Sequence, residues 1–380
     1  MPKHPDPFHE HRQQSGVITA EAEGKDVPLI LRLKDVRKTC KDTKTFSSDN
    51  PFMIILHSEA DVRDVRQVPI ETDPPDHTDY RALVEPIFRK PREPEYQATM
   101  RALIAKMVEQ AAGKDEFEVV RGFAVPLQCK SLAQLLGMPE SESDIWIKWG
   151  VHIFRDSELG SKGSEVDQYI AAKFQEMEGS DGDDFFSVLN RADFRGRKLT
   201  TEEKHGFANL AFAGGRDTII NTVTSILVYL AEHPEAIDFL NEDETRIITA
   251  TEEFVRYVSP VTVISRTCPH ATEVLGHQVE AGERIGLCWP SANRDETVFK
   301  DADEVVLDRT PNPHVGFGFG VHNCLGQHQA RLIIRSLLQE ICEQVERIDL
   351  IEAVPEIEEE SCYSRQVGYK SARIKLVRKT

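Results

Sequence analysis

The sequence predicts a mainly α-helical protein with small β-sheets. Long patterns with the period of an amphipathic helix cover much of the chain, whereas segments typical of strands are short, few and separated by Gly and Pro. The 380 residues contain no internal repeat and no low-complexity linker. We therefore expect a single domain over residues 1–380, which is long enough for a substantial hydrophobic core.

Long helices account for most of the expected structure. They are predicted at Pro94–Gln110, Glu202–His233, Glu244–Val258 and Gly326–Glu346. A shorter helix is expected to begin at the prolines of Asp73–Arg81, because proline is favoured in a first helical turn. The last long helix carries an apolar stripe formed by Leu332, Ile333, Leu337, Leu338 and Ile341.

Short strands fill the remaining regular positions. They are predicted at Val27–Leu33, Glu273–Val279, Arg284–Leu287 and Ala372–Val377. The Gly- and Asp-rich segment Gly179–Asp184 is predicted to be a loop between helices. Residues 1–26 carry no pattern to which we assign a role.

Composition and charge exclude several classes of function. The formal net charge is −18, which argues against a nucleic-acid-binding surface. No apolar run approaches the roughly 20 residues of a transmembrane helix, and the polar start Met1–Pro5 lacks the apolar core of a signal peptide. The seven cysteines are scattered and odd in number, which suits a reducing compartment. We therefore expect a cytoplasmic protein that binds neither nucleic acid nor a membrane.

A glycine-rich loop that ends in a cysteine is the most informative stretch. Residues 317–326 read Phe-Gly-Phe-Gly-Val-His-Asn-Cys-Leu-Gly, just before the last helical pattern. Glycines let a backbone turn tightly and approach a flat partner closely. The N–H groups at the start of the following helix favour a thiolate at Cys324, so this cysteine is a candidate metal ligand.

Other interpretations of the loop require different residues. A dinucleotide-binding loop needs a glycine three positions after Gly320, where Asn323 stands. A zinc site needs a second cluster of Cys or His, and the chain contains no Cys-x-x-Cys. A lone cysteine is most often a small buried apolar residue. The combination of Phe, three Gly, His and Cys within ten residues is much rarer than its parts.

The loop resembles the haem-binding signature of the cytochrome P450 family, Phe-Gly-x-Gly-x-His-x-Cys-x-Gly, at every specified position. The resemblance implies a triangular helical prism around a buried haem b, with Cys324 as the axial thiolate ligand of the iron. It also implies that Phe317 shields the sulfur and that His322 hydrogen-bonds a haem propionate. Gly326 would belong to the same cofactor-binding loop.

Two glycines interrupt the helix expected over Glu202–His233, in the segment Gly214–Thr218. Each glycine costs a helix about 1 kcal/mol relative to Ala, which suggests close packing or a widened turn. The segment resembles the family's acid–alcohol pair. Asp217 would then relay protons, and the Thr218 hydroxyl would steady dioxygen and water at the iron. Arg216, unusual beside an apolar pocket, either points away or biases the choice of substrate.

Three further donors are candidate partners of the haem propionates. His77 and Arg81 fall on one helix face at i, i+4, and Arg266 follows the apolar run after Ser259-Pro260. The resemblance implies that all three bind propionates through charge-assisted hydrogen bonds. It also implies a substrate pocket lined by Leu210, Ala213, Val261 and Val263.

The pair Glu253 and Arg256, at i, i+3, matches the family's structural Glu-x-x-Arg segment. We expect Arg309 to complete this group. Two positions depart from the family pattern. Ile333 stands where a Glu is frequent, which puts a local ion pair in doubt, and Ile219 replaces a frequent second Thr.

The resemblance runs from about Leu33 to the C-terminus and implies a soluble bacterial type of haem-thiolate monooxygenase. Such an oxidoreductase inserts one oxygen atom of O2 into a small organic substrate, by hydroxylation or oxidative O-dealkylation. Two alternatives stay open: a hydrogen-peroxide-driven peroxygenase of the same fold and a non-catalytic haem-binding protein. The acid–alcohol pair argues against both. Loops that line the pocket are expected around Pro51–Arg66 and Arg155–Glu176.

No flavin or iron–sulfur domain is recognisable in the chain, so electrons are expected from a ferredoxin and a ferredoxin reductase. Because both proteins would be acidic, docking needs a local basic patch. Two clusters are candidates: Arg89, Lys90 and Arg92 form one, and Arg331 and Arg335 form the other.

Overall fold

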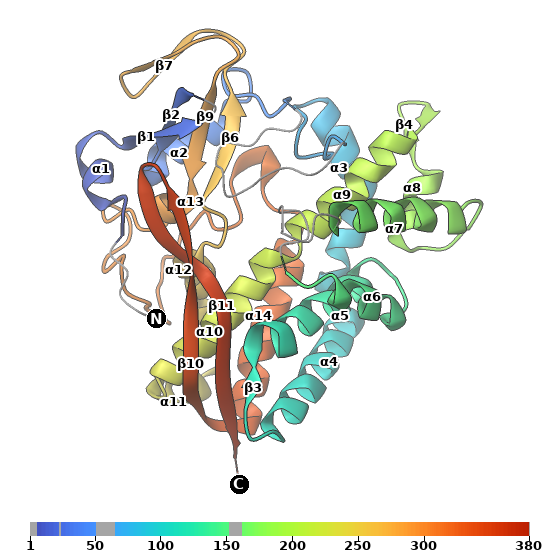
Figure 1. Ribbon diagram of the computed structural model, residues 1–380, viewed down its shortest axis with the longest axis vertical. Coiled ribbons are helices and arrows are strands. Elements are labelled where there is room, and N and C mark those ends of the chain that lie inside the picture. Colours follow the sequence, from blue (N-terminus) through green and yellow to red (C-terminus); the bar gives the residue numbers. More distant parts are fainter. Residues whose placement is uncertain (1–5, 23, 51–64, 152–161, 380) are drawn as a thin grey trace.

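The computed structural model describes residues 6–22, 24–50, 65–151 and 162–379. Helices dominate these residues, and four small sheets accompany them (Figure 1). The α-helices are α1 (His9–Gln14), α2 (Leu33–Lys41), α3 (Asp76–Arg89), α4 (Pro94–Ala112), α5 (Val125–Leu135), α6 (Glu140–Lys148), α7 (Lys162–Glu176), α8 (Phe185–Arg191), α9 (Thr201–Gly214), α10 (Asp217–Glu232), α11 (Glu235–Asn241), α12 (Glu244–Val258), α13 (Trp289–Ala292) and α14 (Gln327–Gln344). Two short 3-10 helices are η1 (Lys90–Arg92) and η3 (Gly320–His322), and one short π-helix is η2 (Val120–Ala124).

The predicted long helices are present with one correction. Segments α4, α12 and α14 match the predicted ranges to within two residues at each end. The helix predicted over Glu202–His233 is instead two helices, α9 and α10, separated at Gly215 and Arg216. A Cβ atom at Gly215 would lie 3.0 Å from the carbonyl oxygen of Ala211, so a larger residue there would require this carbonyl to move by a few tenths of an ångström.

Two of the four sheets have more than two strands. One has the strand order β1–β2–β9–β6, and the other has the order β10–β11–β3. The strands are β1 (Val17–Ala22), β2 (Lys25–Ile30), β3 (Phe117–Glu118), β4 (Asp193–Phe194), β5 (Arg197–Lys198), β6 (Val263–Thr267), β7 (Thr272–Val274), β8 (His277–Val279), β9 (Arg284–Cys288), β10 (Val345–Glu360) and β11 (Tyr363–Arg378). The long hairpin β10–β11 crosses the molecule from the C-terminus to the N-terminal sheet (Figure 1).

The N-terminal segment extends the first sheet. Strand β1 pairs antiparallel with β2 along its whole length. The buried guanidinium of Arg12 pairs with Asp6 at 2.7 Å and with Glu296 at 2.9 Å, and it also donates to Ser291 Oγ at 3.1 Å. These contacts anchor residues to which the sequence assigned no role.

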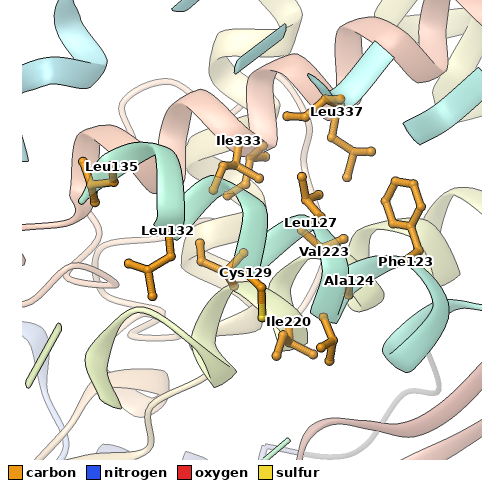
Figure 2. Close-up of a cluster of buried hydrophobic side chains, with 14 of the residues drawn as sticks. Phe123, Ala124, Leu127, Cys129, Leu132, Leu135, Ile220, Val223, Ile333 and Leu337 are labelled. Carbon is orange, nitrogen blue, oxygen red and sulfur yellow. The ribbon is translucent and has the colours of Figure 1, made fainter. Parts of the chain in front are cut away.

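The largest apolar core lies where α5 packs between α10 and α14 (Figure 2). Leu127 of α5 is fully buried and lies between Ile333 of α14 and Val223 of α10. Ile333, which stands where the family often has Glu, is 1% exposed. This position therefore contributes to the hydrophobic core, and burying such a side chain contributes about 1.5–3 kcal/mol.

The described part of the chain has no helix that is both long enough and apolar enough to cross a bilayer.

Candidate functional site

The loop before α14 folds back so that Cys324 contacts Phe317, the first residue of the loop. The N–H of Cys324 donates to Phe317 O at 2.8 Å, and Asn323 Nδ2 donates to the same oxygen at 3.2 Å. Gly318 and Gly320 adopt positive φ angles of 72° and 77°, a region that favours glycine. A Cβ atom at Gly320 would lie only 2.8 Å from Cys40 O. The glycines thus permit both the turn and the close contact with α2.

The thiol of Cys324 has exposed surface, yet protein atoms surround it densely. This burial raises the pKa of Cys324, whereas N–H groups of Gly326 and Gln327 and the charges of Arg81 and Arg331 lower it. The expected helix-start donors are therefore present, but they do not outweigh burial. Because a metal ligates the thiolate, metal binding at this sulfur would release the proton.

Phe317 is fixed from the α14 side. The guanidinium of Arg331 lies 4.4 Å from the centre of the Phe317 ring, a cation–π distance. Arg331 also donates to both carboxylate oxygens of Glu252, at 2.7 and 2.9 Å, and His314 approaches the same carboxylate at 3.1 Å. Glu252 and His314 were not predicted, although Glu252 directly precedes the predicted Glu253.

Two histidines predicted to share one ligand lie together. The rings of His77, on α3, and His322, in the cysteine loop, have centroids 4.2 Å apart. Burial and nearby positive charge lower the pKa of His77 to about 4 and that of His322 to about 2. Both rings are therefore neutral at neutral pH. His77 Nδ1 and His322 Nε2 are buried without a hydrogen-bond partner among the described residues.

Two arginines complete this cluster. Arg266 is 5% exposed, and within the described ranges its side chain donates only to Ser265 O, at 2.6 Å. Arg81 donates to Asn323 O at 2.8 Å. His77 Nδ1 and His322 Nε2 are buried without a partner in the part of the chain that the structure describes, which is costly, and the charges of Arg81 and Arg266 act on both rings. The four side chains together therefore fit a carboxylate ligand. The propionates of haem are such carboxylates, and the residues present therefore fit the cofactor.

The acid–alcohol segment lies at the break between α9 and α10. Thr218 Oγ1 donates to Gly214 O at 3.3 Å, in an exposed position. Asp217 is the first residue of α10 and is partly buried. Arg216 is buried and points away, toward α6, where it donates to Trp146 O at 2.7 Å. This contact decides between the two roles left open for Arg216.

The predicted pocket residues come from two elements. Leu210 and Ala213 are partly buried on α9. Val261 packs against the apolar cluster that contains Val315, and Val263 packs against the cluster that contains Phe8. Most of the first predicted pocket loop and the start of the second fall on residues 51–64 and 152–161, which lie outside the described residues. The rest of the second, Lys162–Glu176, is helix α7, so the prediction of a loop there is wrong.

The group around Glu253 is fully buried. Arg256 donates to both carboxylate oxygens of Glu253, at 2.8 and 2.7 Å, and Arg309 Nε donates to one of them at 2.9 Å. Arg256 also donates to the carbonyl oxygens of Asn293 and Ala302, each at 2.8 Å. The expected third member, Arg309, is therefore in contact with Glu253.

The two predicted basic clusters converge on one residue. The charges of Arg92, Arg331 and Arg89 all lower the pKa of His328, after burial, which has the largest effect. His328 follows Cys324 by four positions on α14. Within this group, Arg331 is engaged with Glu252, and Arg335 lies 3.6 Å from the same carboxylate, whereas Arg92 is exposed.

Comparison with known proteins gives one consistent family. The sequence model described as Cytochrome P450 matches residues 163–347. Linalool 8-monooxygenase of Pseudomonas putida is 28% identical over 359 residues, which are 89% of this chain and 88% of the relative. A steroid C26-monooxygenase of Mycolicibacterium smegmatis is 30% identical, over 75% of this chain and 74% of the relative.

Solved structures give the same fold over nearly the whole chain. One described as a carbohydrate active P450 has a TM-score of 0.93 and 44% sequence identity, and the match covers 99% of both chains. A mutant of P450 EryK in complex with erythromycin B has a TM-score of 0.82 and 26% identity, over 97% of this chain and 95% of that one.

Proposed function

Because the chain belongs to the cytochrome P450 family and is a monooxygenase of the oxidoreductase class, we propose that it oxidises a carbohydrate. The reaction would be hydroxylation or oxidative O-dealkylation, in the cytoplasm, with haem b as cofactor. The observation that carries the substrate class is the 44% identity to a carbohydrate active P450 over 99% of both chains. Linalool 8-monooxygenase and a steroid C26-monooxygenase are less similar, at 28% and 30% identity.

The proposed cofactor site consists of the cysteine loop and of the group formed by His77, His322, Arg81 and Arg266. Cys324 would ligate the iron, and Phe317 and Gly326 would belong to the loop beneath it. The propionates would be bound through hydrogen bonds from His77, Arg81, Arg266 and His322. Among the described residues, His77 Nδ1 and His322 Nε2 have no hydrogen-bond partner of their own. When bound, the haem supplies an iron at which O2 is activated.

Proton delivery is proposed at Thr218 and Asp217. The Thr218 hydroxyl donates its hydrogen to Gly214 O, which leaves its oxygen lone pairs available to accept from a water molecule or from a substrate hydroxyl group. Asp217, one residue earlier, would supply protons to this water. Leu210, Ala213, Val261 and Val263 would exclude bulk water from the reacting carbon.

A ferredoxin is the proposed electron donor, with a ferredoxin reductase behind it. The positive charges of Arg89, Arg92 and Arg331, which lower the pKa of His328, support docking on the surface around His328, close to the cysteine loop. Lys90 is less suited because its ammonium lies 3.9 Å from the carboxylate of Asp183 and its side chain is only 25% exposed.

A substrate screen on the haem-loaded protein tests this function. Unmodified and O-methylated sugars are compared with linalool and a steroid. We expect a sugar to shift the iron from low to high spin and to be oxidised when reductant, ferredoxin and reductase are supplied. A shift with linalool or the steroid, and with no sugar, would remove the carbohydrate proposal. Turnover with hydrogen peroxide alone would favour a peroxygenase, and a spin shift without product would favour a binding protein.

A further inference from the structure

The break between α9 and α10 leaves two carbonyl groups without their helical partners. In an unbroken helix, Gly214 O and Gly215 O would accept from the N–H groups of Thr218 and Ile219. Neither bond forms among these described residues. Gly214 O accepts from Thr218 Oγ1 at 3.3 Å, and Gly215 O accepts from Gln128 Nε2 at 3.0 Å. The first backbone bond beyond the break runs from Ile220 N to Arg216 O, at 3.2 Å.

Gln128 therefore occupies the position of a helical N–H. It lies on α5 and is 1% exposed. Gly215 is partly buried, and a carbonyl shielded from water needs a partner, which the Gln128 amide provides from a neighbouring helix. This removes the main reason for Gly215 O to pair with Ile219 N and close the turn.

Arg216 fixes the other side of the break. It is 1% exposed, and its guanidinium donates to Trp146 O at 2.7 Å, to Gly150 O at 3.0 Å and to Cys129 Sγ at 3.4 Å. Its contacts in the described residues are with these neutral acceptors, at the end of α6 and on α5. Successive helical residues differ by about 100° around the axis, so residues two positions apart point to nearly opposite sides. Anchoring Arg216 toward α6 therefore directs Thr218 to the opposite side.

We propose that Gln128 and Arg216 are positioning residues that hold the helix open at Gly215. They keep the hydroxyl of Thr218 bonded to Gly214 O, so that its oxygen is presented on the exposed side of the break. Gly214 and Gly215 permit this geometry, and the two polar side chains impose it. The inference rests on the proposed function, in which Thr218 and Asp217 deliver protons.

Hydrogen exchange of the haem-loaded protein tests the geometry without turnover. In Gln128→Leu, Gly215 O loses its donor and should pair with Ile219 N. We expect the amide of Ile219 to exchange more slowly by about tenfold, which corresponds to roughly 1.4 kcal/mol. Gln134→Leu is the matched control, because Gln134 lies on the same helix and donates instead to Tyr96 O. Unchanged or faster exchange in Gln128→Leu would overturn the proposal.

Coupling of electron use to product tests the consequence. With the best-bound sugar of the screen, Gln128→Leu and Arg216→Leu should release several times more hydrogen peroxide per electron pair, since proton delivery is sensitive to small displacements. The carbon monoxide spectrum should stay unchanged, and Arg216→Lys should recover part of the coupling. If Arg216→Leu does not fold, Gln128→Leu decides.

Thr218→Ala separates the two levels of the proposal. If Thr218→Ala uncouples and Gln128→Leu does not, the positioning role is wrong while the proposed proton delivery stands. If Thr218→Ala is fully coupled, the proposed proton delivery itself is wrong.

Discussion

The imidazole rings of His77 and His322 lie 4.2 Å apart, with their planes inclined by 60°. One comes from the first turn of α3 and the other from the cysteine loop. Each ring is neutral, because burial and the neighbouring arginines lower both pKa values. Two neutral rings, each with a buried nitrogen that has no hydrogen-bond partner in the described residues, are suited to carboxylates when two guanidinium groups lie beside them.

Replacing His77 should weaken retention of haem. His77→Leu removes one proposed hydrogen bond to a propionate, and such charged hydrogen bonds contribute about 1.5–3 kcal/mol. We expect haem to transfer to apomyoglobin about 10- to 100-fold faster than from the wild type. His205→Leu is the control, because this imidazole on α9 stacks on Phe174 of α7. Equal transfer rates for His77→Leu and the wild type would show that His77 does not hold the cofactor.

Removing the buried carboxylate of Glu253 should strongly destabilise the fold. Glu253→Ala leaves the guanidinium groups of Arg256 and Arg309 buried without their carboxylate, and breaking a buried pair in this way costs about 3–5 kcal/mol. Urea unfolding measures this loss. Glu242→Gln, which removes an exposed partner of Arg246, should cost less than about 1 kcal/mol. Equal losses for the two variants would contradict the structural role of Glu253.

The loss of stability as the pH falls below 5 should depend in part on Glu252. Burial raises the pKa of this carboxyl group, but hydrogen bonds from His314 and Arg331 outweigh it and hold the pKa at about 2. Because this is below the unfolded value of about 4.3, the stabilisation is full above that value and is lost as the pH falls toward 2. Discounted for solvent screening, it amounts to about 1–3 kcal/mol.

The measurement is urea unfolding of the wild type and Glu252→Gln between pH 7 and pH 3. The free-energy difference between the two proteins should be largest at pH 7 and should shrink as the pH falls. A difference that stays constant with pH would show that the Glu252 carboxylate has an ordinary pKa.

Electron transfer from ferredoxin should depend on Arg92. This exposed arginine lies near His328 on the surface proposed for docking. Arg92→Glu should slow reduction of the iron at low salt, and the difference from the wild type should fade as salt screens the charges, with a Debye length of about 8 Å at 0.15 M. Lys25→Glu makes the same charge change at a 66% exposed side chain on β2. If Arg92→Glu and Lys25→Glu slow reduction equally, only net charge matters.

Local signals in the sequence were sufficient to predict several elements closely. Helix α12 has the predicted bounds because an amphipathic pattern stands between the N-cap Asp243 and Pro260. The contact between Glu253 and Arg309 followed from the resemblance, although 56 positions separate the two residues. The strand predicted at Ala372–Val377 is part of β11.

Features that depend on distant contacts were missed. Strand β10 is rich in Glu and contains Pro355, so its alternation is weak, and pairing with β11 determines its conformation. At Gly215 the sequence predicted only close packing or a widened turn, not a break. Its completion depends on Gln128, 87 positions earlier, and nothing in the local pattern of α5 distinguishes that glutamine from Gln134. The position of Arg12 depends in the same way on Glu296.

The central claim is that Cys324 is the axial ligand of a haem iron, and the carbon monoxide spectrum of the reduced protein tests it most directly. The wild type should show the red-shifted Soret band of a thiolate-ligated haem, and so should Cys342→Ala, which alters another cysteine on α14. Cys324→Ala should lose that band. A Cys324→Ala protein that keeps the red-shifted band would contradict the ligand assignment.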